Sequence, residues 1–175
     1  MTKHSEHQRT QDKEKLFAKI LTVSDGVVYG TRQDRSGKAL EGYLAAAGWI
    51  VVERRISEDG TQPVAEALHQ LATDFHGLIV TTGGTGFGPR DLTPEGTRAV
   101  LDREAPGLAE AMRLVNPLGR LSRGLAGTLN TTLIINTPGS EKGCVETLEA
   151  VVDVLPHAVK LLVDNADPHP NRNHS

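Results

Sequence analysis

Short apolar runs alternate with amphipathic segments along most of the chain. Four runs are rich in β-branched residues and end in polar or glycine-rich segments, namely residues 17–23, 49–56, 77–82 and 131–136. Each run is long enough for one strand. Because they are apolar almost throughout rather than at every second position, they indicate parallel strands that helices cover on both faces.

Between these runs, apolar residues recur at intervals of three or four positions, which predicts helices. The predicted helices cover residues 38–48, 64–72, 94–102, 107–114 and 141–163. Pro156 is expected to break or kink the last of them. Ser36 and Thr93 are the expected N-caps of the first and third helices, and Pro94 suits a first turn, where its missing N–H costs nothing. Since strands that alternate with helices form βαβ units, the pattern predicts a three-layer α/β/α fold with a mainly parallel sheet.

The chain of 175 residues has the length of one domain. Residues 1–15 lack an apolar run and residues 166–175 are rich in proline and asparagine, so we expect two disordered tails around a single domain at residues 16–165. No stretch approaches the ~20 apolar residues of a membrane helix, and the first residues lack the apolar core of a secretory signal. With only one thiol in the chain, these features predict a cytoplasmic protein.

Composition excludes several classes of function. Nineteen basic and 22 acidic residues give a net charge of −3, and aromatic residues make up only 3%. This balance gives no electrostatic reason to bind nucleic acid or an anionic membrane, and it leaves few side chains for stacking on bases. The single cysteine, Cys144, excludes an internal disulfide and a cysteine-cluster zinc site. Cys144 is either a buried structural thiol or, near a helix start, a thiol of lowered pKa.

A polar loop follows each of the four predicted strands. The loops begin at Ser24, Glu58, Gly83 and Thr137. In a parallel sheet, these loops emerge at one edge, where open α/β sheets bind their ligands. We therefore expect a ligand site that all four loops share.

The loop at residues 83–88 contains four glycines in six positions. Such a loop can bring backbone N–H groups around a phosphate, or it can be a plain flexible turn. It has no lysine at the position that a P-loop requires. Pro89 stands where the dinucleotide-binding fingerprint requires its third glycine, so neither of these motifs is present.

Four aspartates belong to the same edge of the sheet, namely Asp25, Asp34, Asp59 and Asp91. Aspartates hold Mg²⁺ beside phosphate oxygens in phosphoryl-transfer enzymes, but they also cap helices and stabilise turns. Arg90 and Arg123 leave a similar choice open, because they either neutralise phosphate charge or are ordinary surface residues.

Residues 83–95 read GGTGFGPRDLTPE. This segment resembles the G-G-T-G and R-D-x-T-P-E signature of the molybdopterin adenylyltransferase (MogA/MoaB-like) family of molybdenum cofactor biosynthesis. Shorter motifs of that family occur as TVSD, DRSG, DREAPG, LSR and IINTPGS at residues 22–25, 34–37, 102–107, 121–123 and 134–140. The resemblance covers about residues 19–163 and implies a MogA-like α/β fold.

The resemblance implies that Mg-ATP adenylylates the terminal phosphate of molybdopterin and that pyrophosphate is released, which prepares the product for molybdenum insertion. It implies that Asp59 and Asp91 are the catalytic residues and the Mg²⁺ ligands. Contacts to substrate or nucleotide fall on Ser24, Asp25, Gly83, Gly84, Thr85, Gly86, Asn136, Pro138, Gly139 and Ser140. It further implies a homotrimer, or a hexamer as in some relatives, and hand-over of the product to a molybdenum-insertion protein.

The chain departs from the family pattern at two places. The segment between Asn116 and Leu121 is shorter than in many relatives, and Asn116 stands where several have Ser. Glu58 precedes Asp59 where a proline is common. Since the same fold also serves non-catalytic domains, one alternative is a molybdopterin-binding carrier or scaffold, and another is a different nucleotide-processing enzyme. The carrier would bind the pterin without ATP and release no pyrophosphate.

Overall fold

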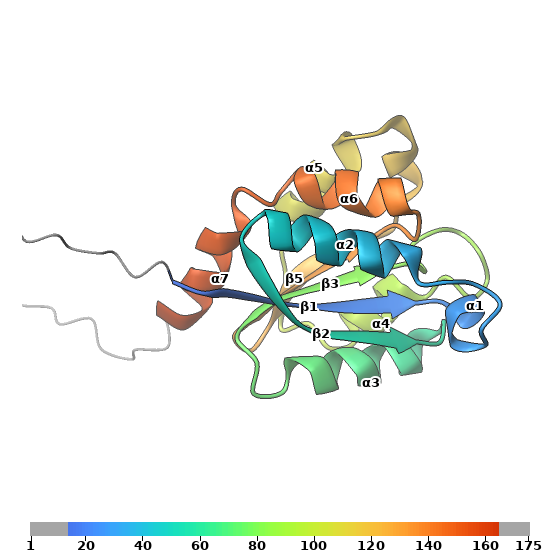
Figure 1. Ribbon diagram of the computed structural model, residues 1–175, viewed down its shortest axis with the longest axis horizontal. Helices are drawn as coiled ribbons and strands as arrows, with labels where there is room; N and C mark the ends of the chain where they lie inside the picture. Colours follow the sequence, from blue (N-terminus) through green and yellow to red (C-terminus); the bar gives the residue numbers. More distant parts are fainter. Residues whose placement is uncertain (1–13, 165–175) are drawn as a thin grey trace, which may run out of the picture.

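A computed structural model describes residues 14–164 of the chain. A sheet lies between two layers of helices (Figure 1), with the strands in the order β2-β1-β3-β6-β5-β4. The strands are β1 (Leu16–Val23), β2 (Trp49–Ser57), β3 (Gly77–Thr82), β4 (Arg103–Glu104), β5 (Ala126–Leu129) and β6 (Thr132–Thr137). Almost all of the two tails predicted at residues 1–15 and 166–175 lies outside the described residues.

The helices are α1 (Asp25–Val28), α2 (Arg35–Ala46), α3 (Thr61–Ala72), α4 (Thr93–Arg98), α5 (Pro106–Leu114), the 3₁₀ helix η1 (Pro117–Leu121), α6 (Glu141–Glu149) and α7 (Leu155–Asp164). Helices α2, α5, α6 and α7 contribute to one hydrophobic cluster, and α3 contributes to the other. Helix α4 packs against α3. The three-layer arrangement predicted from the sequence is therefore confirmed.

Strands β1, β2, β3 and β6 are parallel, as predicted, and each begins and ends within one residue of its expected bounds. The antiparallel edge formed by β5 and β4 was not predicted. These two strands have four and two residues, too few to give a clear period in the sequence. The turn between β5 and β6 places Asn130 in the left-handed region with a φ of 52°, which asparagine tolerates better than most residues.

Two predicted helix caps were wrong. Asp34, not Ser36, caps α2, because its carboxylate accepts hydrogen bonds from the Gly37 N–H and the Thr22 hydroxyl. The Thr93 hydroxyl does not cap α4 but donates to the Gly83 carbonyl at 2.8 Å. The break expected near Pro156 is present, since α6 ends at Glu149 and α7 begins at Leu155.

Cys144 is fully buried in α6, within the larger hydrophobic cluster. Burial raises the pKa of its thiol to about 11. The structure thus favours the buried structural thiol over a reactive one.

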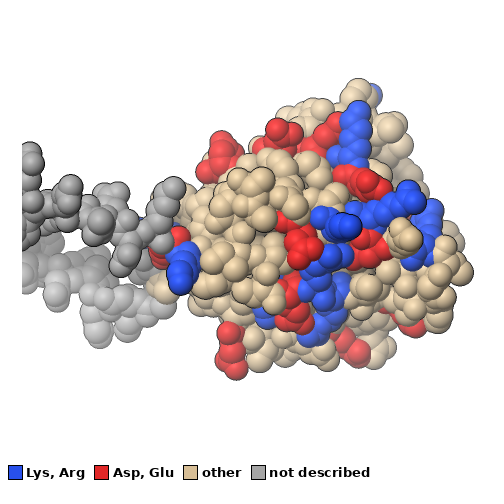
Figure 2. All heavy atoms as spheres, in the orientation of Figure 1, with Lys and Arg blue, Asp and Glu red and all other residues tan. Residues whose placement is uncertain are grey.

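The face that carries α2 and β2 shows basic side chains beside acidic ones (Figure 2). Between β2 and α2, the Arg54 guanidinium lies 2.7 Å from the carboxylates of both Asp34 and Glu41. In the described part of the chain, no helix has the length and apolar composition needed to cross a bilayer.

The loop after β3 is held tightly against the ends of the neighbouring strands. Gly83 has a φ of +100°, and its N–H donates to the Thr137 carbonyl at 3.1 Å. A side chain at Gly83 would collide with the Val23 carbonyl oxygen of β1. Only glycine suits this position, because the conformation and the close approach both exclude a Cβ atom.

We predict that Gly83→Ala destabilises the protein by about 2–3 kcal/mol, because strain and a backbone collision add. Gly42→Ala is the control, since Gly42 lies in α2 with a φ outside the left-handed region and open space around it. That change should stabilise the helix by roughly 0.5–1 kcal/mol. Denaturant unfolding of both variants measures the two effects, and an unchanged midpoint for Gly83→Ala would contradict the packing described.

Candidate active site

A cleft of about 1240 Å³ opens at the carboxyl edge of the parallel strands. The loops after the four parallel strands contribute Ser24, Asp59, residues 83–86 together with Asp91, and residues 138–140. All the residues predicted to form the site line this cleft except Asp25 and Asn136. The fold thus brings together loops that are more than a hundred residues apart in the sequence.

The glycine loop forms one wall of the cleft and is fixed by backbone contacts rather than free. Gly84 has a φ of +67°, and its carbonyl accepts a hydrogen bond from the Thr93 N–H at 3.0 Å. A side chain at Gly84 would collide with the Thr93 hydroxyl and would lie 3.3 Å from Asp59 Oδ1. The loop is therefore an ordered wall next to Asp59, which favours the phosphate-binding interpretation over a flexible turn.

Asp25 and Asp59 each accept a hydrogen bond from the other's backbone N–H group. The Asp25 N–H donates to Asp59 Oδ2 at 2.9 Å, and the Asp59 N–H donates to Asp25 Oδ1 at 3.1 Å. Arg90 completes the arrangement, because its Nε donates to Asp25 Oδ2 at 2.5 Å and its Nη2 to the Asp59 carbonyl at 2.9 Å. The hydrogen bond from Arg90 lowers the pKa of Asp25. Asp25 thus sits behind the cleft and fixes Asp59 within it.

Asp59 has the opposite electrostatic environment. Burial raises the pKa of its carboxyl group, and the charges of Asp25 and Asp91 raise it further, whereas the Asp25 N–H lowers it. Its carboxylate lines the cleft, and no basic side chain forms an ion pair with it among the described residues. A cation in the cleft would offset the cost of keeping this group ionised.

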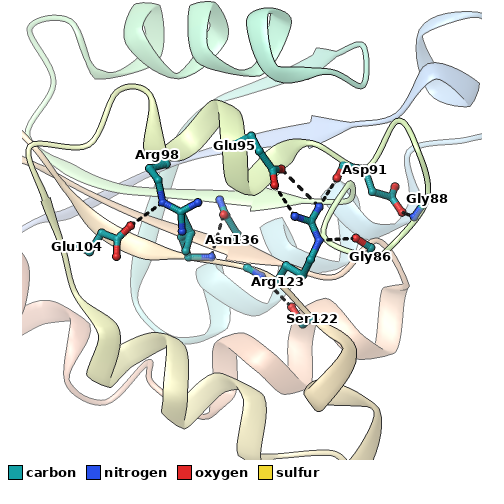
Figure 3. A network of polar contacts seen from close by, with 11 residues as sticks. Gly86, Gly88, Asp91, Glu95, Arg98, Glu104, Ser122, Arg123 and Asn136 are labelled. Atoms are coloured by element: carbon teal, nitrogen blue, oxygen red, sulfur yellow. Dashed lines mark hydrogen bonds and ion pairs between the residues drawn. The ribbon is translucent and has the colours of Figure 1, made fainter.

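Asp91 reaches the cleft from the far end of the glycine loop. Its Oδ2 accepts a hydrogen bond from the Gly88 N–H at 2.8 Å (Figure 3). Since the charge of Asp91 contributes to the raised pKa of Asp59, the two carboxylates are close enough to repel each other. The two acids that the sequence singled out therefore line the same cleft as the glycine loop.

Across residues 14–164, no three His, Cys, Asp or Glu side chains gather into a group that could hold a metal ion. Two carboxylates in a polar cleft nevertheless suit Mg²⁺, which binds through one or two carboxylates and completes its shell with waters and substrate phosphates. Asp59 and Asp91 fit this pattern, whereas a structural zinc site would need four protein ligands.

The two serines predicted as ligand contacts also act as helix caps. The Ser24 hydroxyl accepts from the Val27 N–H at 3.3 Å, and the Ser140 hydroxyl accepts from the Gly143 N–H at 3.0 Å. Both residues line the cleft. They therefore place the starts of α1 and α6 at its wall.

Asn136 is placed differently from the expectation. It is 2% exposed, and its side-chain amide donates to the hydroxyls of Thr81 and Thr97, both at 3.0 Å. Its Oδ1 accepts from the Leu125 N–H at 3.0 Å. The structure does not bring this side chain to the cleft, because all of its polar atoms tie β6 to the neighbouring strand, helix and loop.

Sequence reasoning missed several residues that line the cleft. Ser36 does so while only 8% exposed. Three basic residues also line the cleft, namely Arg32, Arg35 and Lys142, and the last two pair with glutamates of the same cleft. The DRSG motif contained Ser36, but the capping rule assigned its side chain to the helix start. The basic residues stand singly in the sequence, so no pattern distinguished them from surface residues.

Comparison with known proteins agrees with this geometry. Residues 19–157 match the family described as "Probable molybdopterin binding domain". The molybdopterin adenylyltransferase of Helicobacter pylori is 37% identical over 153 residues, which cover 83% of this chain and 87% of that protein. The molybdopterin adenylyltransferase of Escherichia coli is 38% identical over 141 residues, which cover 77% of this chain and 72% of that protein.

A solved structure shares the fold. The crystal structure of the molybdopterin biosynthesis enzyme MoaB from Thermus thermophilus superposes with a TM-score of 0.80 at 46% identity, and the match covers 85% of this chain and 97% of that one. The resemblance inferred from the motifs is confirmed. The chain belongs to the molybdopterin-binding domain family of molybdenum cofactor biosynthesis proteins.

Proposed function

We propose that this protein is a molybdopterin adenylyltransferase that transfers the adenylyl group of Mg-ATP to the terminal phosphate of molybdopterin. The observation that carries the proposal is the meeting of Asp59 and Asp91 in one cleft with the glycine loop. The names of the relatives from Helicobacter pylori and Escherichia coli support this reaction.

In this reaction, a terminal phosphate oxygen of molybdopterin attacks the α-phosphorus of ATP. The bond from that phosphorus to the bridging oxygen breaks, and pyrophosphate leaves with the electron pair. No side chain has to remove a proton, because a phosphate monoester with a second pKa of about 6 is already largely a dianion near neutral pH. The protein has to bring two anions together in line and to stabilise the charge that develops.

The chain's own residues divide this work. Backbone N–H groups of residues 84–86 and the Thr85 hydroxyl bind phosphate oxygens and orient them. Asp59 and Asp91 hold Mg²⁺, which when bound neutralises phosphate charge and reduces the repulsion between the reactants. Arg35 and Lys142 also line the cleft, where they pair with Glu141 and Glu146, and their cationic groups can contact anionic groups of the substrates.

The proposal extends to assembly and location. We assign the protein to the cytoplasm as a homotrimer, with a hexamer as the alternative, that passes its product to a molybdenum-insertion protein. Apolar surface supports assembly, because Leu114 and Val115 at the end of α5 are 84% and 46% exposed in the single chain and lie outside the cleft.

We predict that Asp91→Asn slows pyrophosphate release by about 10²–10³-fold, because the cleft loses half of its proposed cation ligands. The control is Asp153→Asn, at an exposed position outside the cleft, which should leave the rate unchanged. Pyrophosphate release from ATP is measured with Mg²⁺, with and without molybdopterin.

Three outcomes of that assay would contradict the proposed reaction. Full turnover of Asp91→Asn would remove the assigned role of the carboxylate. Pterin binding without ATP dependence and without pyrophosphate would identify a carrier, and pyrophosphate release without the pterin would identify a different nucleotide-processing enzyme.

We predict opposite effects on stability for two neighbouring aspartates. A raised folded-state pKa, as at Asp59, means that stability is lost as the pH rises through that pKa. Asp59→Asn should therefore raise the melting temperature at neutral pH, while it abolishes turnover. The gain should shrink as acid protonates the wild-type carboxyl group.

Asp25→Asn is the matched control, because Arg90 lowers the pKa of Asp25. The stability that Asp25 contributes is present above the ordinary aspartate pKa and is lost as the pH falls through the lowered folded-state value. This variant should therefore melt at a lower temperature than wild type at neutral pH. Calorimetric melts from neutral to acidic pH compare the two variants, and a lower melting temperature for Asp59→Asn at neutral pH would show that its environment has been misread.

A further inference from the structure

Arg123, in the segment between η1 and β5, makes four polar contacts with the glycine loop and α4 (Figure 3). Its Nε donates to the Gly86 carbonyl at 2.8 Å, and its Nη2 donates to the Asp91 carbonyl. Its Nη1 forms an ion pair with the Glu95 carboxylate. Its backbone N–H donates to the Thr85 carbonyl at 2.9 Å. One residue thus joins both ends of the exposed part of the loop.

Besides Arg123, the contacts of Arg90 with the Asp25 carboxylate and with the Asp59 carbonyl hold the exposed part of the loop. Residues 87–90 are exposed, and the Phe87 side chain is 70% exposed instead of packing into the core. Asp91 is held at the end of this segment, and its carboxylate accepts from the Gly88 N–H of the same segment. The position of the Asp91 carboxylate therefore depends on the contacts that close the loop.

The geometry excludes the two roles that the sequence left open for Arg123. Arg123 does not line the cleft, so it is not placed to neutralise a substrate phosphate. Its side chain is 33% exposed, and the guanidinium donors face loop carbonyls and Glu95, so it is not an ordinary surface residue. The hydrogen bonds from Arg123 lower the pKa of Glu95, which keeps the partner carboxylate ionised.

We propose that Arg123 is a positioning residue for Asp91, because it closes the glycine loop so that the Asp91 carboxylate stands in the cleft near Asp59. Its relevance to catalysis rests on the proposed function. The planar guanidinium is required, because a lysine cannot join two carbonyls and a carboxylate in fixed directions.

Arg98 provides a matched control in the same region (Figure 3). It lies in α4 and forms an ion pair with Glu104 at 3.0 Å, with its side chain 57% exposed. It makes no hydrogen bond to the glycine loop among the described residues. Replacing it removes an arginine–glutamate pair without opening the loop.

The experiment compares Arg123→Gln, Arg123→Lys and Arg98→Gln in the full chain by two readouts. The first is amide hydrogen exchange at Gly88, whose N–H donates to Asp91 and so reports the position of that carboxylate. Both Arg123 variants should exchange at least about tenfold faster than wild type, and Arg98→Gln should exchange at the wild-type rate. Arg123→Lys keeps the charge and tests the proposal if Arg123→Gln fails to fold.

The second readout is the kinetics of pyrophosphate release. Arg123→Gln should lower kcat by about 10–10²-fold, as expected for a displaced catalytic group, with little change in the KM for molybdopterin. In the Asp91→Asn background the same change should have almost no further effect, because the two residues act as one unit.

Unchanged exchange at Gly88 in both Arg123 variants would overturn the proposal, whatever the activity of the protein. The proposal would also be overturned if the reductions in kcat of the two single variants multiplied in the double variant, because Arg123 would then act independently of Asp91. Absence of pyrophosphate release from wild type would instead refute the proposed function, and the exchange readout would still decide whether Arg123 positions Asp91.

Discussion

Two carboxylates that share one cleft are the constraint around which this site is organised. Asp59 and Asp91 share one cleft, and burial together with neighbouring negative charge raises the pKa of Asp59. The fold keeps them there by giving each a backbone N–H donor, from Asp25 and Gly88 respectively. These two carboxylates by themselves disfavour an anionic substrate beside them, whereas a divalent cation bound to them would favour it. The proposed adenylyl transfer depends on this effect of a bound cation on the binding of anionic substrates.

The order of the strands sets where the three acids lie relative to one another. Strand β1 lies between β2 and β3 in the sheet, so Asp25 follows the middle strand and lies between the loops that carry Asp59 and Asp91. Arg90 pairs with Asp25 and leaves the two outer acids without an arginine on their carboxylates. Arg90 and Arg123 both lie outside the cleft, and each contacts the backbone of one of the outer acids. Basic groups thus hold the acidic pair in place without neutralising it.

The sequence predicted the parts of this structure that depend on local pattern. Four long apolar runs predicted the four parallel strands. The convergence of the loops that follow parallel strands predicted the location of the cleft. The short strands β4 and β5 gave no period, and the capping rule failed at Thr93 because a tertiary contact with Gly83 uses its hydroxyl. Asn136 belongs to the IINTPGS motif, but its side chain stabilises the fold. The motif alone does not reveal that role. The contacts of Arg123 join residues 37 and 32 positions apart, so only the folded chain shows them.

The central claim is that Asp59 and Asp91 together hold a divalent cation on the nucleotide. A crystal grown with Mn²⁺ and a non-hydrolysable ATP analogue tests this most directly, through the anomalous signal of the metal. The account predicts one peak between the two carboxylates, in contact with both and with phosphate oxygens of the analogue. A peak bound to the phosphates alone, with both carboxylates turned away from it, would contradict the account.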